Sequence, residues 1–375
     1  MLQFETDCIT RICERKTMST SIHIIGSRHS GGAEMFFIRL VNALDEAGHQ
    51  VSTISRAGSM VSKGLASSIE QAHVGMYNVR DPLSRLHISR IIRKKDPDIV
   101  QTYMGRATRL TRVPKGGRTI HVSRLGGFYK LDGYRHANAW VGNTGSICDY
   151  LIENGFPADR VFKIPNFVER SATPPAQVLR SLRDKLGIPE DAFIIVGVGR
   201  FMEKKGFRYL VEAFHQLPEH IQGRPTHLLI AGSGPEEKKL VSQAARLNLN
   251  TRVHWAGWQT DPGPCYALGD VFVCPSLHEP LGNVILEAWS QGIPVISTLT
   301  HGALELVQDG TNGLLVPCGN AEAISEAVKT LFLSGDSLAK ELACSGLSLI
   351  EKKYSKNAVV RSYLELYDHL LTSRG

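Results

Sequence analysis

Long apolar runs are missing from the sequence, and this absence excludes the common type of membrane-spanning protein. No stretch of the 375 residues approaches the roughly 18 to 20 uninterrupted apolar positions that a spanning helix requires. The first seventeen residues are too polar to serve as the apolar segment of a signal peptide. The sequence therefore predicts a cytoplasmic protein.

Paired cysteines and clustered metal ligands are missing as well. The seven cysteines contain no CxxC pair and lie at positions 8, 13, 148, 265, 274, 318 and 344. The fourteen histidines are dispersed without ligand spacing, and no DxD triplet lies in a plausible ligand loop. We expect reduced thiols, no metal site and no cofactor.

The sequence does contain enough apolar material for more than one hydrophobic core. Apolar residues make up 42% of the chain and charged residues 21%, which is the balance of a soluble globular protein. The length exceeds that of one ordinary core and favours two domains.

Positive charge is concentrated in the first half of the chain. Residues 1–170 contain 24 Lys and Arg against 15 Asp and Glu, whereas residues 171–375 contain 19 against 21. The densest part, residues 51–150, contains 16 basic and 6 acidic side chains. Two interpretations stay open: a solvated basic face, or a surface that receives an anionic partner.

Short apolar runs alternate with helical patterns, which is typical of parallel sheets covered by helices. Strands are predicted near residues 22–25, 51–55, 99–102, 119–122, 139–142, 193–198, 227–231, 271–273 and 295–297. Helices are predicted near residues 35–44, 209–217 and 359–371. We therefore predict an α/β protein with two Rossmann-like domains that face each other across a ligand-binding cleft.

The pattern lapses around Pro165 and again at the Pro174-Pro175 pair, where we place the domain boundary. The predicted parts are a flexible extension, an N-terminal domain, a C-terminal domain and a final helical segment that returns to the first domain. Their predicted bounds are 1–17, 18–169, 170–354 and 355–375.

Two carboxylates eight residues apart, Glu279 and Glu287, form the most specific feature of the chain. The segment Leu281-Gly282-Asn283 between them runs from a loop into an apolar helix, and its backbone N–H groups could bind an anion. Glu287 could then accept hydrogen bonds from ribose hydroxyls, and Glu279 from a sugar hydroxyl. The alternative is an acid favoured by the helix dipole together with a surface glutamate.

The spacing of Glu279 and Glu287 resembles the E-x7-E signature of the family 4 retaining glycosyltransferases, which have the GT-B fold. Other segments similar to that family occur in the expected order, namely Gly31-Gly32-Ala33-Glu34, Ile164-Pro165-Asn166, Gly199-Arg200, Glu203-Lys204-Lys205-Gly206, Ala231-Gly232-Ser233-Gly234 and Gly310-Thr311-Asn312-Gly313. The resemblance extends from about Ser21 to the last helix. It implies a nucleotide diphosphate sugar as donor, with Gly31, Gly32, Gly232 and Gly234 beside it.

Arg200 and Lys205 suit the chemistry that the resemblance implies, because cleavage of a glycosyl phosphate bond places negative charge on the departing diphosphate. A guanidinium fork and a mobile ammonium can hold that charge. Together with Glu279 they are the predicted catalytic residues. Lys204 is expected to be an exposed loop lysine.

The first half departs from the family pattern at two places where many relatives have histidine. Neither Gln101-Thr102-Tyr103 nor Arg124-Leu125-Gly126-Gly127 contains one. Arg124, Gly126 and Gly127 are instead predicted to form an acceptor loop, with an anionic acceptor as the partner of Arg124. His121 is expected to point into a neighbouring strand.

The resemblance implies transfer of a sugar to an envelope glycan or a lipid-linked acceptor, such as lipopolysaccharide core, O-antigen or exopolysaccharide. Two alternatives stay open, a GT-B nucleotide-sugar epimerase and a non-catalytic module that binds nucleotide-sugar or nucleic acid. We expect no nucleic-acid partner, since no helix-turn-helix, zinc finger or RNP-like motif is found.

Residues 83–95 combine apolar and basic side chains in a way that favours a membrane surface as a further partner. The apolar members are Leu83, Leu86, Ile88, Ile91 and Ile92, and the basic members are Arg85, Arg90, Arg93, Lys94 and Lys95. Two interpretations again stay open. The stretch docks on the inner face of the cytoplasmic membrane, or its apolar residues are the packing face of an ordinary helix.

Overall fold

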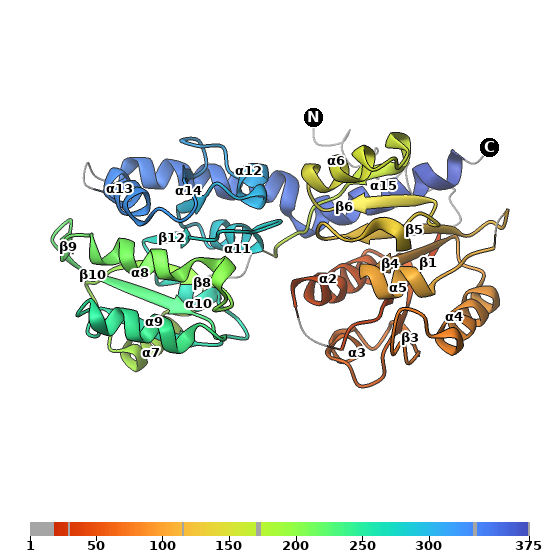
Figure 1. Ribbon diagram of the computed structural model, residues 1–375, viewed down its shortest axis with the longest axis horizontal. Coiled ribbons are helices and arrows are strands. Elements are labelled where there is room, and N and C mark those ends of the chain that lie inside the picture. The colour runs from red at the N-terminus through yellow and green to blue at the C-terminus, as the bar shows by residue number, and fades with distance from the viewer. Residues whose placement is uncertain (1–18, 29–30, 115, 170–173, 333–335, 374–375) are drawn as a thin grey trace, which may run out of the picture. The chain divides into compact units, whose positions relative to one another are not determined.

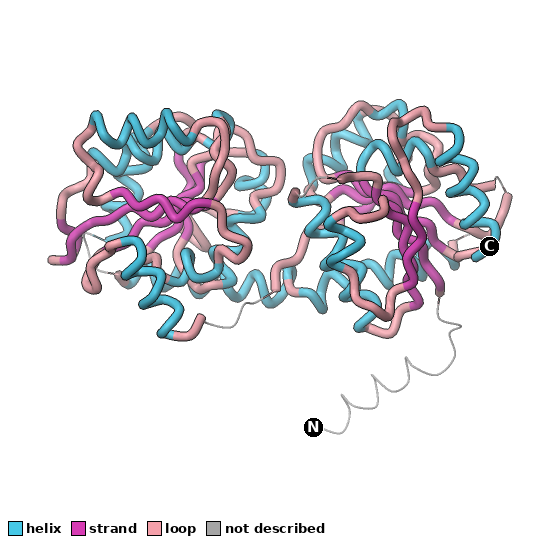
Figure 2. Tube along the Cα trace, turned by 90° about the horizontal axis from the view of Figure 1, so that it is seen from below, coloured by secondary structure: helices cyan, strands magenta, loops and turns pink. Residues whose placement is uncertain are grey.

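The computed structural model describes residues 19–28, 31–114, 116–169, 174–332 and 336–373. The chain divides into two compact units. The first contains the chain up to Pro165 and again from Val359 onward, and the second is Asn166–Ala358. In each unit a parallel sheet lies between helices, as predicted (Figure 1; Figure 2). The predicted extension 1–17 lies outside the described residues.

The first unit is built on a sheet of seven strands. Its elements are β1 (Thr20–Ile25), α2 (Gly32–Glu46), β2 (Gln50–Ser55), α3 (Met60–Gly64), β3 (Glu70–His73), α4 (Pro82–Lys95), β4 (Ile99–Tyr103), α5 (Met104–Leu110), β5 (Ile120–Leu125), β6 (Ala139–Gly142), α6 (Gly145–Glu153), β7 (Val161–Lys163) and the returning α15 (Lys356–Thr372). The strand order is β3-β2-β1-β4-β5-β6-β7. Every pairing is parallel.

The two faces of the first sheet differ in chemistry. Ile22 and Ile24 of β1 pack with Ile88 and Ile92 of α4 in an apolar cluster. On the other face, buried polar side chains receive α15. Tyr367 donates to Gln101 Oε1 at 2.8 Å, and the Nε of Arg124 donates to the hydroxyl of Tyr363 at 2.7 Å. The last helix is therefore bound to the first sheet by specific hydrogen bonds as well as by apolar packing.

The second unit repeats this architecture. Its elements are α7 (Ala176–Leu186), β8 (Phe193–Val198), α8 (Phe207–His215), β9 (His220–Ile221), β10 (Arg224–Ala231), α9 (Glu237–Arg246), β11 (Val253–Gly257), α10 (Gly263–Ala267), β12 (Val271–Cys274), α11 (Asn283–Ser290), β13 (Val295–Thr298), α12 (His301–Leu306), β14 (Leu314–Val316), α13 (Ala321–Phe332) and α14 (Ser337–Leu349). The strand order is β11-β10-β8-β12-β13-β14, with β9 antiparallel to β10.

Helix α11 carries the second carboxylate of the motif, and a buried tryptophan anchors this helix. Trp289 is fully buried, and its indole N–H donates to the carbonyl of Asn312 at 3.0 Å. Gly346 of α14 lies against the ring, so that a Cβ at this position would be 2.5 Å from Trp289 Nε1. The close approach of the two helices therefore depends on the absence of a side chain at residue 346.

Substitution Gly346→Ala should destabilise the protein, although alanine is the better helix former. Propensity alone would favour alanine by about 1 kcal/mol. We expect the clash with Trp289 to outweigh that gain, with a net loss of about 1 to 3 kcal/mol. Denaturant unfolding measures the change, with Ser345→Ala on the same helix as control. An increase in the free energy of unfolding for Gly346→Ala would contradict this account of the packing.

Candidate functional site

Four loops meet at the carboxyl ends of the strands in the second unit, and they carry the residues of the motif. These loops follow β8, β10, β12 and β13. Parallel α/β sheets bind their ligands at this edge.

An ion pair between Lys205 and Glu279 joins the loop after β8 to the loop after β12. The two side chains are 20% and 13% exposed, so the pair is largely shielded from water. Burial opposes the charge of Lys205, but the Glu279 carboxylate and, more weakly, that of Glu287 outweigh it, and the pKa of Lys205 lies above its ordinary value. Lys205 is therefore a stable cation at this edge.

The backbone holds these two loops together independently of the ion pair. The carbonyl of Lys204 accepts hydrogen bonds from the N–H groups of Leu277 at 2.8 Å and His278 at 3.2 Å. Gly206 has a φ of 66°, and any side chain there would collide with the carbonyl of Pro275. Lys204 thus acts through its backbone, whereas its side chain is exposed as expected.

Gly302 supports the Glu279 loop, and the sequence interpretation missed it. Its N–H donates to the carbonyl of Glu279 at 2.7 Å. A Cβ on Gly302 would lie 2.5 Å from the carbonyl carbon of Leu281, so only glycine fits. The one available signal was a glycine shortly after a predicted strand, which is too common to be specific.

Helix α11 begins directly after Gly282, close to the predicted start. Gly282 adopts the left-handed conformation, with a φ of 77°, that turns the loop into the helix. The side chain of Asn283 accepts a hydrogen bond from Asn166 Nδ2 at 2.9 Å. One turn further, Glu287 accepts a hydrogen bond from the hydroxyl of Tyr266 at 3.0 Å. Glu287 is thus oriented by a buried tyrosine.

Gly232 and Gly234 follow β10 and pass very close to the loop after β8. A Cβ on Gly234 would lie 2.5 Å from the carbonyl oxygen of Phe201, and one on Gly232 would collide with the carbonyl of Gly199. Both glycines have φ near 150°, in the region that side chains rarely adopt. They therefore have a structural role in the crossing of the two loops, whatever ligand this edge receives.

Arg200 stands apart from this cluster. Its side chain is exposed, and among the described residues it forms no side-chain hydrogen bond or ion pair. The structure thus brings Lys205, Glu279 and Glu287 together, whereas the side chain of Arg200 is exposed to solvent.

Two tryptophans in and just after strand β11 differ in their surroundings. Trp255 is half-buried against Phe201, with ring centroids 6.0 Å apart, whereas Trp258 is exposed. Trp255 therefore packs inside the unit. Trp258 presents its ring to solvent.

In the first unit, Gly31 and Gly32 lie at the start of the long helix α2. Gly31 is the N-cap in an extended conformation, and Gly32 is the first helical residue. Neither has a positive φ, so a left-handed turn is not the reason for glycine here. The helix start after β1 agrees with the sequence prediction.

Arg124 belongs to strand β5 and not to a loop, which corrects the predicted acceptor loop. It is 5% exposed, its guanidinium lies 4.0 Å above the ring of Phe36, and its Nε is bonded to Tyr363. The prediction failed because Ser123 and Arg124 interrupt the apolar pattern of the strand. Gly126 and Gly127 do follow the strand. His121 points into the sheet as expected, with Nε2 2.9 Å from the hydroxyl of Thr102.

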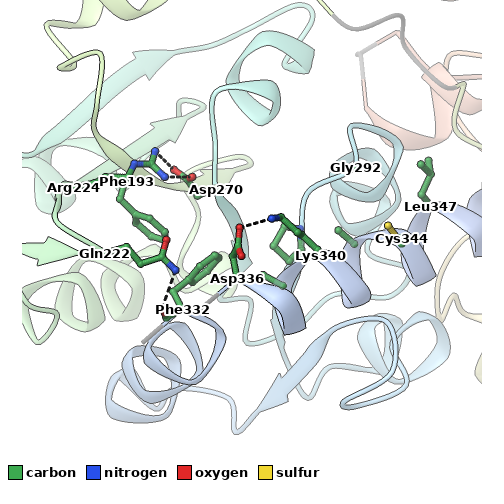
Figure 3. Close-up of a pocket in the computed structure, with 13 residues that line it drawn as sticks. Phe193, Gln222, Arg224, Asp270, Gly292, Phe332, Asp336, Lys340, Cys344 and Leu347 are labelled. Atoms are coloured by element: carbon green, nitrogen blue, oxygen red, sulfur yellow. Dashed lines mark hydrogen bonds and ion pairs between the residues drawn. The ribbon is translucent and has the colours of Figure 1, made fainter. Parts of the chain in front are cut away.

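A cavity of about 280 Å³ lies in the second unit, but at the opposite edge of its sheet. It is lined by Phe193 and Arg224, which begin their strands, and by Asp270 and Pro294, which precede theirs. Figure 3 shows the Arg224–Asp270 ion pair on one side of it. The cavity is therefore separate from the cluster around Lys205.

The described residues contain no group of three potential metal ligands. The DxD triplet Asp96-Pro97-Asp98 lies at the amino end of β4, where Arg118 pairs with both carboxylates. It is thus far along the strand from the ligand edge. In the part of the chain that the structure describes, no helix has the length and apolar character of a membrane span.

Two family profiles together account for most of the chain. Residues 30–172 match the family described as Glycosyltransferase Family 4, and residues 180–343 match Glycosyl transferases group 1. A lipopolysaccharide core biosynthesis glycosyltransferase of Rhizobium meliloti, LpsE, is 36% identical over 339 residues, covering 90% of this chain and 95% of the relative. The chain belongs to the family 4 glycosyltransferases.

Solved structures similar to this glycosyltransferase have its fold. A glycosyltransferase from Rickettsia africae superposes with a TM-score of 0.82 at 23% identity, covering 95% of this chain and 99% of that one. Anabaena HepE, solved in complex with UDP and glucose, gives 0.78 at 20% identity, covering 94% and 100%. The prediction of a GT-B fold is confirmed.

Substitution Lys205→Ala should lower kcat/KM for glycosyl transfer by about 100-fold or more, because it removes a fixed positive charge from the ligand edge. The matched control is Lys204→Ala, whose exposed side chain should matter less than about twofold. Initial rates at varied donor concentration measure both. Equal losses in the two variants would contradict the assignment of the site.

Proposed function

We propose that this glycosyltransferase is a retaining, metal-independent hexosyltransferase that moves a sugar from a nucleotide diphosphate donor to an envelope glycan acceptor. The observation that carries the proposal is the cluster of Lys205, Glu279 and Glu287 at the carboxyl edge of the second sheet. A shielded cation beside two oriented carboxylates suits a donor that has both a diphosphate and hydroxyl groups.

In the proposed reaction, the bond between the anomeric carbon and the diphosphate oxygen breaks while an acceptor hydroxyl oxygen bonds to that carbon from the same face. The acceptor proton passes to the departing phosphate oxygen, so that no carboxylate base is required. Lys205 and the exposed Arg200 stabilise the charge that develops on the diphosphate. Glu279 accepts from a sugar hydroxyl and Glu287 from the ribose.

The donor and acceptor classes are supported by the relatives. HepE, which shares the fold, was solved with UDP and glucose, which favours a UDP-hexose as the first donor to test. LpsE functions in lipopolysaccharide core biosynthesis, and its likeness extends over most of both chains, which favours a core oligosaccharide as the acceptor. Gly31, Gly32, Gly232 and Gly234 would border the donor, and Gly126 and Gly127 the acceptor.

The proposal predicts a product with the anomeric configuration of the donor, formed equally well in excess EDTA. The measurement is incubation of the protein with UDP-glucose and a lipopolysaccharide core acceptor, followed by NMR of the new linkage. An inverted linkage would refute retention. Loss of activity in EDTA that magnesium or manganese restores would refute metal independence, and release of UDP with no glycosylated acceptor would favour an epimerase.

A membrane surface is the proposed setting of the acceptor, and α4 is the element that would approach it. Ile88 and Ile92 are buried and belong to the packing face, which corrects the larger predicted set. Leu83 and Leu86, however, are 77% and 46% exposed. They lie among exposed basic residues of the same helix, namely Arg85, Arg90, Arg93 and Lys94. Each such charge near an anionic surface contributes about 1 kcal/mol.

We expect the protein to sediment with phosphatidylglycerol vesicles at low salt and to be released at high salt. Replacement of Arg85, Arg90, Arg93 and Lys94 by Ser should abolish sedimentation, while phosphatidylcholine vesicles serve as the uncharged control. Negligible binding of the unaltered protein to both lipids would exclude membrane docking and favour a soluble acceptor.

A further inference from the structure

Three arginines from separate parts of the sequence converge at the carboxyl edge of the first sheet. Arg28 lies just beyond β1, Arg56 follows β2 directly, and Arg106 belongs to α5 after β4. The Nη1 atoms of Arg56 and Arg106 both donate to the carbonyl oxygen of Met76, each at 3.3 Å. Because they share one acceptor atom, these two guanidinium groups are immediate neighbours.

Further contacts hold Arg106 and the shared Met76 carbonyl in place. Arg106 also donates to the carbonyl of Gly26 at 2.9 Å, and its side chain lies so close to Gly26 that a Cβ there would be 3.0 Å from Cδ. Met76 is held in the left-handed region with a φ of 43°, and its N–H donates to Ser84 Oγ at 2.8 Å. The shared carbonyl therefore has a fixed direction.

No described carboxylate pairs with the two buried or half-buried arginines of this cluster. Arg56 is 6% exposed, and within the described ranges neither Arg56 nor Arg106 forms an ion pair. Burial, followed by the charges of Arg28 and Arg106, lowers the pKa of Arg56, and only the phenol of Tyr77 opposes this. Arg106 is half-buried and Arg28 is exposed, so the cluster opens to solvent, where an anion can offset the repulsion between its like charges.

We propose that Arg56 and Arg106, with Arg28, bind a phosphate group of the acceptor. This inference rests on the proposed transfer reaction and adds the chemical class that the first unit recognises. A guanidinium uses planar pairs of N–H donors on phosphate oxygens, and in hydrogen bonds to the described residues Arg56 and Arg106 each use only Nη1. Several cations together favour a multiply charged phosphate over a single carboxylate. Arg124, by contrast, uses its Nε in a buried hydrogen bond to Tyr363.

Binding of inorganic phosphate to the full-length chain tests the site directly. We expect phosphate to raise the melting temperature of the unaltered protein, and the shift to disappear in Arg106→Gln and Arg56→Gln. If the variant of the buried Arg56 fails to fold, Arg28→Gln replaces it, and we expect this change at an exposed residue to reduce the phosphate-induced shift only in part. Arg90→Gln on α4 and Lys205→Ala should retain the phosphate shift, whereas the shift produced by UDP should be lost in Lys205→Ala and kept in Arg106→Gln. No phosphate shift in the unaltered protein, or an equal one in every variant, overturns the proposal.

Transfer assays then identify the source of the phosphate. With a phosphorylated core acceptor, Arg106→Gln should raise the acceptor KM at least about tenfold and leave the donor KM unchanged. With the dephosphorylated acceptor, Arg106→Gln and the unaltered protein should behave alike. An unchanged acceptor KM combined with weaker binding to phosphatidylglycerol vesicles would assign the cluster to a lipid headgroup and overturn the acceptor assignment. Absence of transfer by the unaltered protein, with phosphate binding intact, would instead refute the proposed function.

Discussion

The ion pair between Lys205 and Glu279 is the interaction around which the ligand edge of the second unit is arranged. It joins loops that follow two different strands. Backbone hydrogen bonds of Lys204 and Gly302, and the close approach of Gly206 to Pro275, hold the same loops in place. Because water is largely excluded, each charge needs the other until a ligand takes its place. Lys205 could pair with a diphosphate, and Glu279 could accept a hydrogen bond from a sugar hydroxyl. Ligand contacts would then replace the ion pair between the two side chains.

The buried and half-buried arginines of the first unit lie in two different environments. Arg124 is satisfied inside the fold by Tyr363 and Phe36, and it thereby attaches the last helix to the sheet. Arg56 and Arg106 lie at the sheet edge and donate their hydrogen bonds to backbone carbonyls, and the Arg56 guanidinium also lies 5.3 Å from the centre of the Tyr77 ring. The basic character of the first half of the sequence thus includes a structural arginine, exposed charges on helix α4, and the cluster of Arg56 and Arg106. Only the last of these has the geometry of a binding site.

Much of the fold could be predicted from the sequence because the central strands are apolar runs, such as Phe193–Val198. The edge strands β3, β7, β11 and β14 and the two-residue β9 were missed, since they are short or only partly apolar. Lys205 and Glu279 could be found because they belong to a spaced motif. The proximity of Arg56 and Arg106 could not be predicted, because it depends on the strand order. In that order β2 and β4 both flank β1, so that their carboxyl ends lie near each other. Arg124 was placed in a loop because its burial depends on Tyr363, a residue far along the chain.

A double-mutant cycle on Lys205 and Glu279 tests the central claim most directly. The four proteins are the unaltered chain, Lys205→Ala, Glu279→Ala and the double variant, and kcat/KM for the donor is measured in each. If the two side chains act as one donor-binding unit, the double variant should lose much less than the product of the single losses, with a coupling free energy of about 1 kcal/mol or more. Losses that simply multiply would show that the two residues act independently, and would contradict the account.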